Sequence, residues 1–311
     1  MTYKFPILLL LVFLSALCNN INGQSFEELI TSADHKYRNQ EYYDSGKLYT
    51  SAFEIQEGSA LHYYNAACSW SLAKDTTKAL SYLIIAADKG WKNIQHIRSD
   101  KDLISLQNNS KWALVLQKVQ ANIDYYERDF DKPLQKELEH IYTKDQMLRQ
   151  LYQEAESKFG KDSPEMDFFW DLMSSQDSLN EIAVIKILEE YGWVGKNKVG
   201  GKANMAIWLV IQHASPDIQQ RYLPLLETSV KDKESSGRHL AMLQDRILMN
   251  RGEPQIYGSQ IVTDSISNMQ IVYKVAQPEY VNYRRKSIGL GSIEDYVKRW
   301  KIKWNVPQKE P

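Results

Sequence analysis

Cysteine is scarce in this sequence, which has only Cys18 and Cys68 among its 311 residues. Cys18 falls in an N-terminal segment that we expect to be removed, and a mature chain with Cys68 alone forms no internal disulfide. Long apolar runs are also missing: residues 5–17 form a run of about 13, whereas a membrane-spanning helix needs roughly 20. We therefore expect a mature chain that is stabilised by packing and has no transmembrane span.

A surplus of basic residues is absent too, since 38 Lys and Arg residues face 39 Asp and Glu residues and the formal net charge is −1. Nucleic-acid binding relies on clustered positive charge, so we expect no nucleic-acid partner. The glycine-rich nucleotide-binding loops, the His-Glu-x-x-His zinc motif and the Gly-x-Ser-x-Gly nucleophile motif are also missing. The sequence therefore predicts neither a metal site nor a bound cofactor.

The first 23 residues have the form of a secretory signal peptide. Lys4 supplies the positive start, an apolar run follows, and the polar stretch before Gln24 ends in Gly23. Cys18 offers an alternative, a bacterial lipid anchor, but Leu17 is too large for the small residue that such anchors prefer before the cysteine. We expect an exported protein, periplasmic or secreted, that begins near Gln24, and lipid anchoring is the less favoured reading.

Residues 24–128 carry a repeat with a period of 34, which is typical of tetratricopeptide helix pairs. Small and aromatic residues of the first copy align with those of the second: Ala33, Ser45, Tyr49 and Ala52 with Ala67, Ala79, Leu83 and Ala86. Two copies are too few to be stable alone, so we expect the apolar residues up to Val119 to form a helical cap. Such repeats predict a protein or peptide partner, with Tyr42, Tyr43, Tyr63 and Tyr64 as candidate contacts.

Residues 129–311 predict a second, mostly helical domain. Pro133 and Ser163-Pro164 indicate helix starts, Gly160 and Gly192 indicate helix ends, and residues 143–146 and 178–181 have the form of capping boxes. Residues 255–263 and 269–275 are rich in β-branched and aromatic side chains and predict a β-hairpin, followed by a final helix over 292–300. The predicted fold class is mainly α: helical hairpins and a cap, then a helical domain with a small C-terminal hairpin.

Several motifs of this domain occur in the order found in a known bacterial family. They are Asp145-Gln146 with Arg149, Tyr191-Gly192-Trp193, Gln212-His213-Ala214, Leu243-Gln244-Asp245-Arg246 and Gln255-Ile256-Tyr257-Gly258-Ser259-Gln260. Together they resemble the family called domain of unknown function 6624, over roughly residues 134–300. The sequence departs from the family where Ser259 replaces threonine and Val194 replaces proline. The resemblance implies a helical core and a set of candidate residues, but no activity.

The candidate catalytic residues are His213, Asp245 and Arg246. An imidazole exchanges protons near neutral pH, although a histidine at a helix end can also serve only as a cap. Asp245 and Arg246 stand between apolar residues of one helix, so they form either part of an active site or buried ion pairs, Asp245 with Arg149 or Arg246 with Asp145.

The candidate binding residues come from two segments that the resemblance would place around one cleft. If residues 255–260 are extended, Gln255, Tyr257 and Ser259 share one face of a strand. We interpret Arg284-Arg285-Lys286 as a solvated face or as ion-pair partners. The candidate binding residues are Asp145, Gln146, Arg149, Gln255, Tyr257 and Gln260.

Two functions remain open at this point, and whether the protein is an enzyme is not decided. The favoured one is a protein- or peptide-binding module of the cell envelope, because helical repeats are interaction modules. The other is a metal-independent hydrolase in which His213 is the general base, Asp245 orients it and Arg149 or Arg246 holds an anionic group. The second requires His213 and Asp245 to face one cleft.

Overall fold

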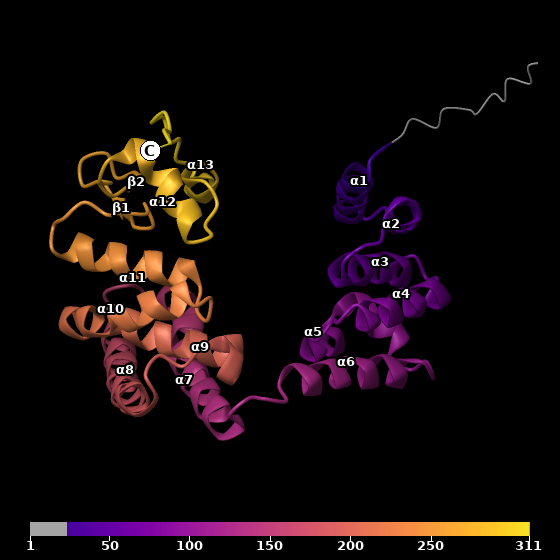
Figure 1. Cartoon of the computed structure of the whole chain (residues 1–311), viewed down its shortest axis with the longest axis horizontal. Coiled ribbons are helices and arrows are strands. Elements are labelled where there is room, and N and C mark those ends of the chain that lie inside the picture. Colours follow the sequence, from indigo (N-terminus) through magenta and orange to yellow (C-terminus); the bar gives the residue numbers. More distant parts are fainter. Residues whose placement is uncertain (1–23, 311) are drawn as a thin grey trace, which may run out of the picture. The chain divides into compact units, whose positions relative to one another are not determined.

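The computed structural model describes residues 24–310 and divides into two compact units, one ending at Tyr126 and one beginning at Glu127 (Figure 1). Helices dominate both units, and one short antiparallel sheet occurs near the C-terminus, which confirms the predicted fold class. The predicted signal peptide and Cys18 lie outside the described residues. None of the helices in residues 24–310 is long and apolar enough to cross a membrane.

The first unit opens with consecutive helices that pack on one another: α1 on α2, α2 on α3 and α3 on α4. The starts of corresponding helices keep the 34-residue period, Phe26 with Ala60 and Tyr42 with Thr76, which is consistent with tetratricopeptide-like hairpins. Close approach is possible because the residues between helices are small; the buried Ser45 hydroxyl lies 2.9 Å from that of Ser69. The bounds are α1 Phe26–Arg38, α2 Tyr42–Ile55, α3 Ala60–Leu72 and α4 Thr76–Asp88.

A cap of three helices follows: α5 (Ile94–Ser99), the 3-10 helix η1 (Lys101–Leu106) and α6 (Trp112–Tyr126). Helix α6 packs on α4, and η1 packs on α3. Their apolar side chains complete the core that the repeats begin, as the sequence predicted. The buried residues of the cap are Ile97, Leu103, Leu106, Trp112, Val115 and Val119.

The second unit is built on two long helices, α7 and α8, which both pack on α9. Helix α9 is buried over most of its last three turns, because Ala203 to Ile211 are almost all small or apolar. Gly200 has a φ of 84°, which breaks α9 near its start and favours glycine there. The bounds are α7 Lys132–Phe159, α8 Pro164–Tyr191, α9 Lys196–His213, α10 Pro216–Lys231 and α11 Gly237–Asn250.

The helix ends test the sequence-based boundaries. Pro133 lies in the first turn of α7 and Ser163-Pro164 begins α8, and Gly160 and Gly192 follow the C-termini of these helices, as predicted. Asp131, which was not predicted, caps the N-terminus of α7. The two predicted capping boxes at 143–146 and 178–181 are wrong, because both lie inside these helices. Their hydroxyls instead donate one turn back, Thr143 to the carbonyl of Glu139.

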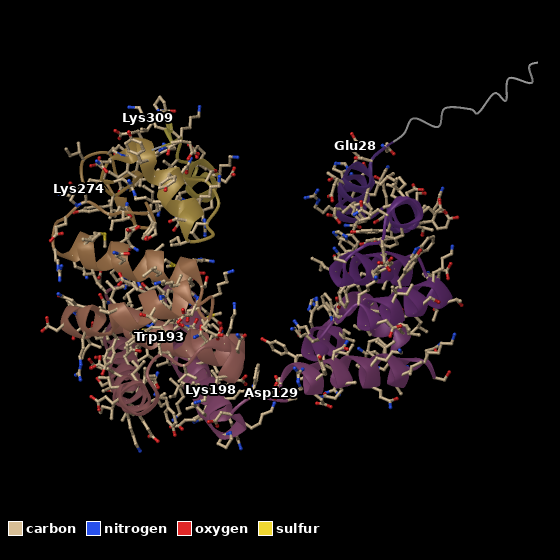
Figure 2. All side chains as sticks on the ribbon, viewed as in Figure 1. Glu28, Asp129, Trp193, Lys198, Lys274 and Lys309 are labelled. Atoms are coloured by element: carbon tan, nitrogen blue, oxygen red, sulfur yellow. The ribbon has the colours of Figure 1, made fainter. Side chains whose placement is uncertain are left out.

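After α11 the chain forms the predicted hairpin, but with strands of three residues each. Strand β1 (Ile261–Thr263) pairs antiparallel with β2 (Gln270–Val272), with Ile261 opposite Val272. The predicted final helix is shorter and continues as a 3-10 turn, and the helix before it was not predicted from sequence. These last helices are η2 Pro278–Tyr280, α12 Val281–Ser287, α13 Ile293–Val297 and η3 Lys298–Trp300. Side chains fill the space between neighbouring helices in each unit (Figure 2).

Candidate functional site

His213 and Asp145 meet where the end of α9 lies beside the middle of α7. The two lie 3.2 Å apart, from Nδ1 of the imidazole to Oδ1 of the carboxylate. The Asp145 side chain is 1% exposed and that of His213 is 23% exposed, so the carboxylate lies behind a partly accessible imidazole. If Nδ1 carries the proton donated to Asp145, Nε2 is the nitrogen that remains for a substrate or ligand.

Arg149 joins this pair to a second carboxylate. Its Nη1 lies 3.4 Å from Oδ1 of Asp145, one turn earlier on α7, and its Nη2 donates to Asp177 of α8 at 2.8 Å. Gln146 donates to the other oxygen of Asp145 at 2.7 Å. Burial alone would raise the pKa of Asp145, but His213, Gln146 and Arg149 outweigh burial and hold this pKa below its usual value. Asp145 is therefore a carboxylate at neutral pH.

Arg246 of α11 reaches the same region without a carboxylate partner. Its Nη1 donates to the backbone carbonyl of Gln212 at 3.2 Å, and its buried Nε has no partner among residues 24–310. Burial lowers the pKa of Arg246, although a guanidinium stays charged. The predicted ion pair of Arg246 with Asp145 is wrong, because the side chains that contact the Asp145 carboxylate are those of Arg149, His213 and Gln146.

Arg149, His213 and Arg246 line one cavity of about 510 Å³ between α7, α8, α9 and α11. We call it the arginine cavity. Asp145 and Asp177 approach His213 closely enough that one ligand atom from each could contact a common metal ion. The remaining lining residues are Tyr152, Trp170, Met173, Ser174 and Asp177.

Asp245 does not belong to the arginine cavity. It is fully buried, and its carboxylate accepts hydrogen bonds from the backbone N–H groups of Ile256, Tyr257 and Ser259, at 2.7, 3.0 and 2.8 Å. Burial raises the pKa of Asp245, and these three donors oppose that rise. The expectation that Asp245 orients His213 is wrong: Asp145 contacts the imidazole, and Asp245 holds a loop.

That loop, residues 255–260, is not the extended strand that the alternation predicted. Gln255 accepts from Gln260 N–H and donates to the carbonyl of Tyr273, and Gln260 donates to that of Met242. Both glutamines are buried, so their amides serve the fold. Tyr257 is only partly buried, and burial raises the pKa of its hydroxyl.

Two arginines hold this loop from the other side. Arg285 is 3% exposed and donates to the carbonyl of Tyr257 at 2.8 Å, and Arg284 donates to that of Ile256 at 2.9 Å. Neither is the solvated face or the ion-pair partner predicted from sequence. Asp245 thus binds the N–H groups of the loop, and the two arginines bind its carbonyls.

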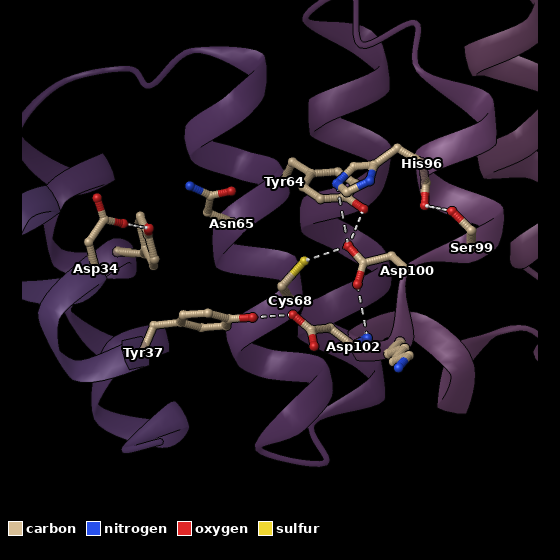
Figure 3. Close-up of a pocket in the computed structure, with 11 residues that line it drawn as sticks. Asp34, Tyr37, Tyr64, Asn65, Cys68, His96, Ser99, Asp100 and Asp102 are labelled. Atoms are coloured by element: carbon tan, nitrogen blue, oxygen red, sulfur yellow. Dashed lines mark hydrogen bonds and ion pairs between the residues drawn. The ribbon is translucent and has the colours of Figure 1, made fainter. Parts of the chain in front are cut away.

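A second cavity, of about 520 Å³, lies in the first unit between α1, α3 and the start of the cap (Figure 3). We call it the acidic cavity. Tyr64 donates to Asp100 at 2.6 Å, the Tyr37 hydroxyl donates to Asp102, and the Cys68 thiol lies 3.8 Å from Asp100. The other lining residues are Asp34, Tyr49, Asn65, His96, Ser99 and Lys101.

Burial and the nearby carboxylates raise the pKa of the Tyr37 and Tyr64 hydroxyls and of the Cys68 thiol. All three groups are therefore neutral at physiological pH, and the charge of the acidic cavity comes from its aspartates. Among the tyrosines expected as contacts, Tyr64 lines this cavity, whereas Tyr63 packs in the core against Phe53. No sequence motif marks the three aspartates, because Asp34 lies in α1 and Asp100 and Asp102 lie at the start of the cap, and only the packing of these elements brings them to one cavity.

The fold and the site define the second unit as a helical domain whose inner helices bring one histidine and two arginines to a single cavity. The model of a family of unknown function, DUF6624, matches residues 132–306, and the chain belongs to this family. A search of curated proteins found no match, and a search of solved structures found none either.

Proposed function

We propose that the protein works outside the cytoplasm as a peptide-binding module, and that the acidic cavity receives a lysine or arginine side chain of the bound peptide. The observation that carries this proposal is the lining of that cavity, in which Asp34, Asp100 and Asp102 face a single lysine, Lys101, and His96. His96 approaches Asp100 at 3.6 Å, and among residues 24–310 no arginine or lysine pairs with the three aspartates.

The chemistry of the lining favours a cation. Each aspartate accepts a hydrogen bond from a tyrosine: Asp34 from Tyr49, Asp100 from Tyr64 and Asp102 from Tyr37. These bonds hold the carboxylates in position without neutralising them. Tyrosine rings also attract cations through their faces. An ammonium or guanidinium group entering here would meet fixed negative charge and aromatic walls together.

The size and setting of the cavity favour a peptide. A volume of about 520 Å³ accommodates a side chain or short segment and is far too small for a folded domain. Stacked helical repeats present extended surfaces along which a chain can lie. The cavity would then bind one side chain of a peptide that lies along α1 and α3.

The test uses a fluorescein-labelled nonapeptide of alanine and serine with one central lysine, and the same peptide with norleucine in its place. Fluorescence polarisation should show tighter binding of the lysine peptide by about tenfold or more, as expected for a hydrogen bond to a charged group. Asp34→Asn and Asp102→Asn should each remove most of that difference. Asp44→Asn, at an exposed acid of the same unit, should not.

Equal binding of the two peptides, or a lysine preference that survives both cavity variants, would contradict the proposal. Far-UV circular dichroism should show the same helicity for all three variants, because Tyr37 and Tyr49 can still donate to an asparagine oxygen.

Export is proposed from the N-terminal segment and has a separate test. After expression with a secretion-competent host, mass spectrometry of the mature chain should show Gln24 as its first residue. A chain that begins with an acylated Cys18 would instead place the protein on a membrane, and a chain that keeps Met1 would refute export.

A hydrolase is the second candidate, and the contact of His213 with Asp145 beside Arg149 favours it. Nε2 of His213 would take a proton from water as the water oxygen attacks an ester, and would return this proton to the leaving alcohol. Hydrolysis of p-nitrophenyl acetate and p-nitrophenyl phosphate should fall at least 100-fold in His213→Ala. Rates for the unaltered protein equal to those of buffer would refute this candidate for such esters.

A further inference from the structure

The two carboxylates at the arginine cavity both pair with Arg149, and neither contacts Arg246. Arg149 is matched by Asp145 and Asp177, which flank it at 3.4 and 2.8 Å. Among residues 24–310 no carboxylate pairs with Arg246, which donates to the backbone carbonyl of Gln212. A partly buried guanidinium without a counter-ion is costly, so the folded domain gains from an anion that reaches it.

The geometry of Arg246 leaves part of its guanidinium for such an anion. Nη1 is bonded to Gln212, while Nε is shielded from solvent and has no partner among the described residues. Nη2 makes no hydrogen bond to the described residues and is not one of the buried atoms, so it is the group from which a phosphate or carboxylate oxygen in the cavity can accept. Arg149 and His213 line the same cavity and supply further N–H groups.

The arginine cavity is also lined by apolar side chains. Trp170 is 47% exposed and its ring centroid lies 5.1 Å from that of Tyr152, and the buried Met173 lines the same cavity. A large exposed tryptophan beside buried polar groups is typical of a site that receives a ligand with an apolar or flat part.

A divalent cation is the competing occupant, since Asp145, Asp177 and His213 could supply three ligand atoms. The charges of the cavity argue against it. The Arg149 guanidinium already contacts both carboxylates, and a metal ion would have to displace it and would then share the cavity with two guanidinium groups. An anion at Arg246 would meet a guanidinium that contacts no carboxylate and would displace no existing ion pair.

We propose that the arginine cavity binds the oxyanion, phosphate or carboxylate, of a small organic ligand whose apolar part packs on Trp170, with Arg246 as the main anion contact. This site lies in the second unit and is independent of the peptide proposal. It also holds whether or not His213 catalyses cleavage of the ligand.

The test uses isothermal titration calorimetry on the full chain with phenyl phosphate, benzoate, inorganic phosphate and neutral phenol. Phenyl phosphate or benzoate should bind, and phenol should not. The tighter-binding compound of the first two shows whether the site prefers a phosphate or a carboxylate. Arg246→Gln should weaken binding by about 10- to 100-fold, the value of a charge-assisted hydrogen bond. Arg221→Gln, an exposed arginine on α10 paired with Glu189, is the matched control and should bind as before.

Trp170→Ala provides a second variant that changes only an exposed side chain, so it should fold even if Arg246→Gln does not. It should weaken phenyl phosphate binding and leave inorganic phosphate binding unchanged. Equal binding of phenyl phosphate and phenol, or unchanged affinity in a folded Arg246→Gln, would overturn the proposal. So would tight Mn²⁺ or Zn²⁺ binding that Asp177→Asn abolishes, in a protein that binds neither anion.

Discussion

Substituting Asp245 should release the loop of residues 255–260 from the second unit. In Asp245→Asn one carboxylate oxygen becomes an NH₂ group, which donates instead of accepting. The N–H of Ser259 faces one oxygen at 2.8 Å and that of Ile256 faces the other at 2.7 Å. Whichever way the amide is turned, one of these two N–H groups meets another donor.

The magnitude follows from the number of bonds that are lost. A buried donor left without an acceptor costs about 1–3 kcal/mol, and Asp245→Ala removes the acceptor of three N–H groups. Burial disfavours the charged form of Asp245 and raises its pKa. Either substitution removes this buried charge, which offsets part of the loss of stability. We expect the free energy of unfolding to fall by about 2 kcal/mol in Asp245→Asn and by about 3 kcal/mol in Asp245→Ala.

Urea denaturation measures the loss, and amide hydrogen exchange locates it. The N–H groups of Ile256, Tyr257 and Ser259 should exchange faster in both variants, whereas amides of the first unit should not change. Glu253→Gln, an exposed acid that follows α11, is the control and should resemble the unaltered protein. Stability within about 0.5 kcal/mol of the original, with all three amides still protected, would refute the assigned role of Asp245.

Three further predictions concern single positions. In Gly237→Ala the new methyl group would lie 1.9 Å from the carbonyl oxygen of Ile288, so the free energy of unfolding should fall by about 2 kcal/mol. In Gly201→Ala the methyl group meets no atom within 4 Å, so this substitution should be neutral or stabilising. The midpoints of urea denaturation measure both effects. Burial lowers the pKa of His239 to about 4, so stability should fall as pH drops from 6.5 towards 4, by up to about 3 kcal/mol. His239→Gln should flatten that part of the stability profile, and an unchanged slope would contradict the assignment. The Cys68 thiol is 5% exposed and its pKa is raised, so Ellman's reagent should modify it slowly in the native protein and rapidly in guanidinium chloride.

Local signals in the sequence predicted most of the helical framework. Pro133, Ser163 and Gly192 act within one turn of their own positions, so the helix starts and the helix end that they mark could be inferred without knowing any neighbour. The same local reasoning failed at Thr143 and Ser178. Both have the residue types of a helix start, but α7 and α8 continue through them because their apolar faces pack on other helices.

The candidate site could be predicted only in part. His213, Arg149 and Arg246 were identified from sequence, and the structure places all three at one cavity. The acid that contacts the His213 imidazole was not identified, because Asp145 and Asp245 are equally plausible partners until the packing of the helices is known. Residues 255–260 looked like a strand from alternation alone, whereas three hydrogen bonds to one buried carboxylate determine their shape.

The sequence by itself determined that this chain is mainly helical, that its first helices repeat with a period of 34, and that its second unit carries the motifs of one family. Those properties depend on periodicity and on residues close together in the chain. Only the tertiary structure decided which charges meet. Asp145, Asp177, His213 and Arg246 come from four different helices, and their contacts depend on how α7, α8, α9 and α11 pack, which no local pattern encodes.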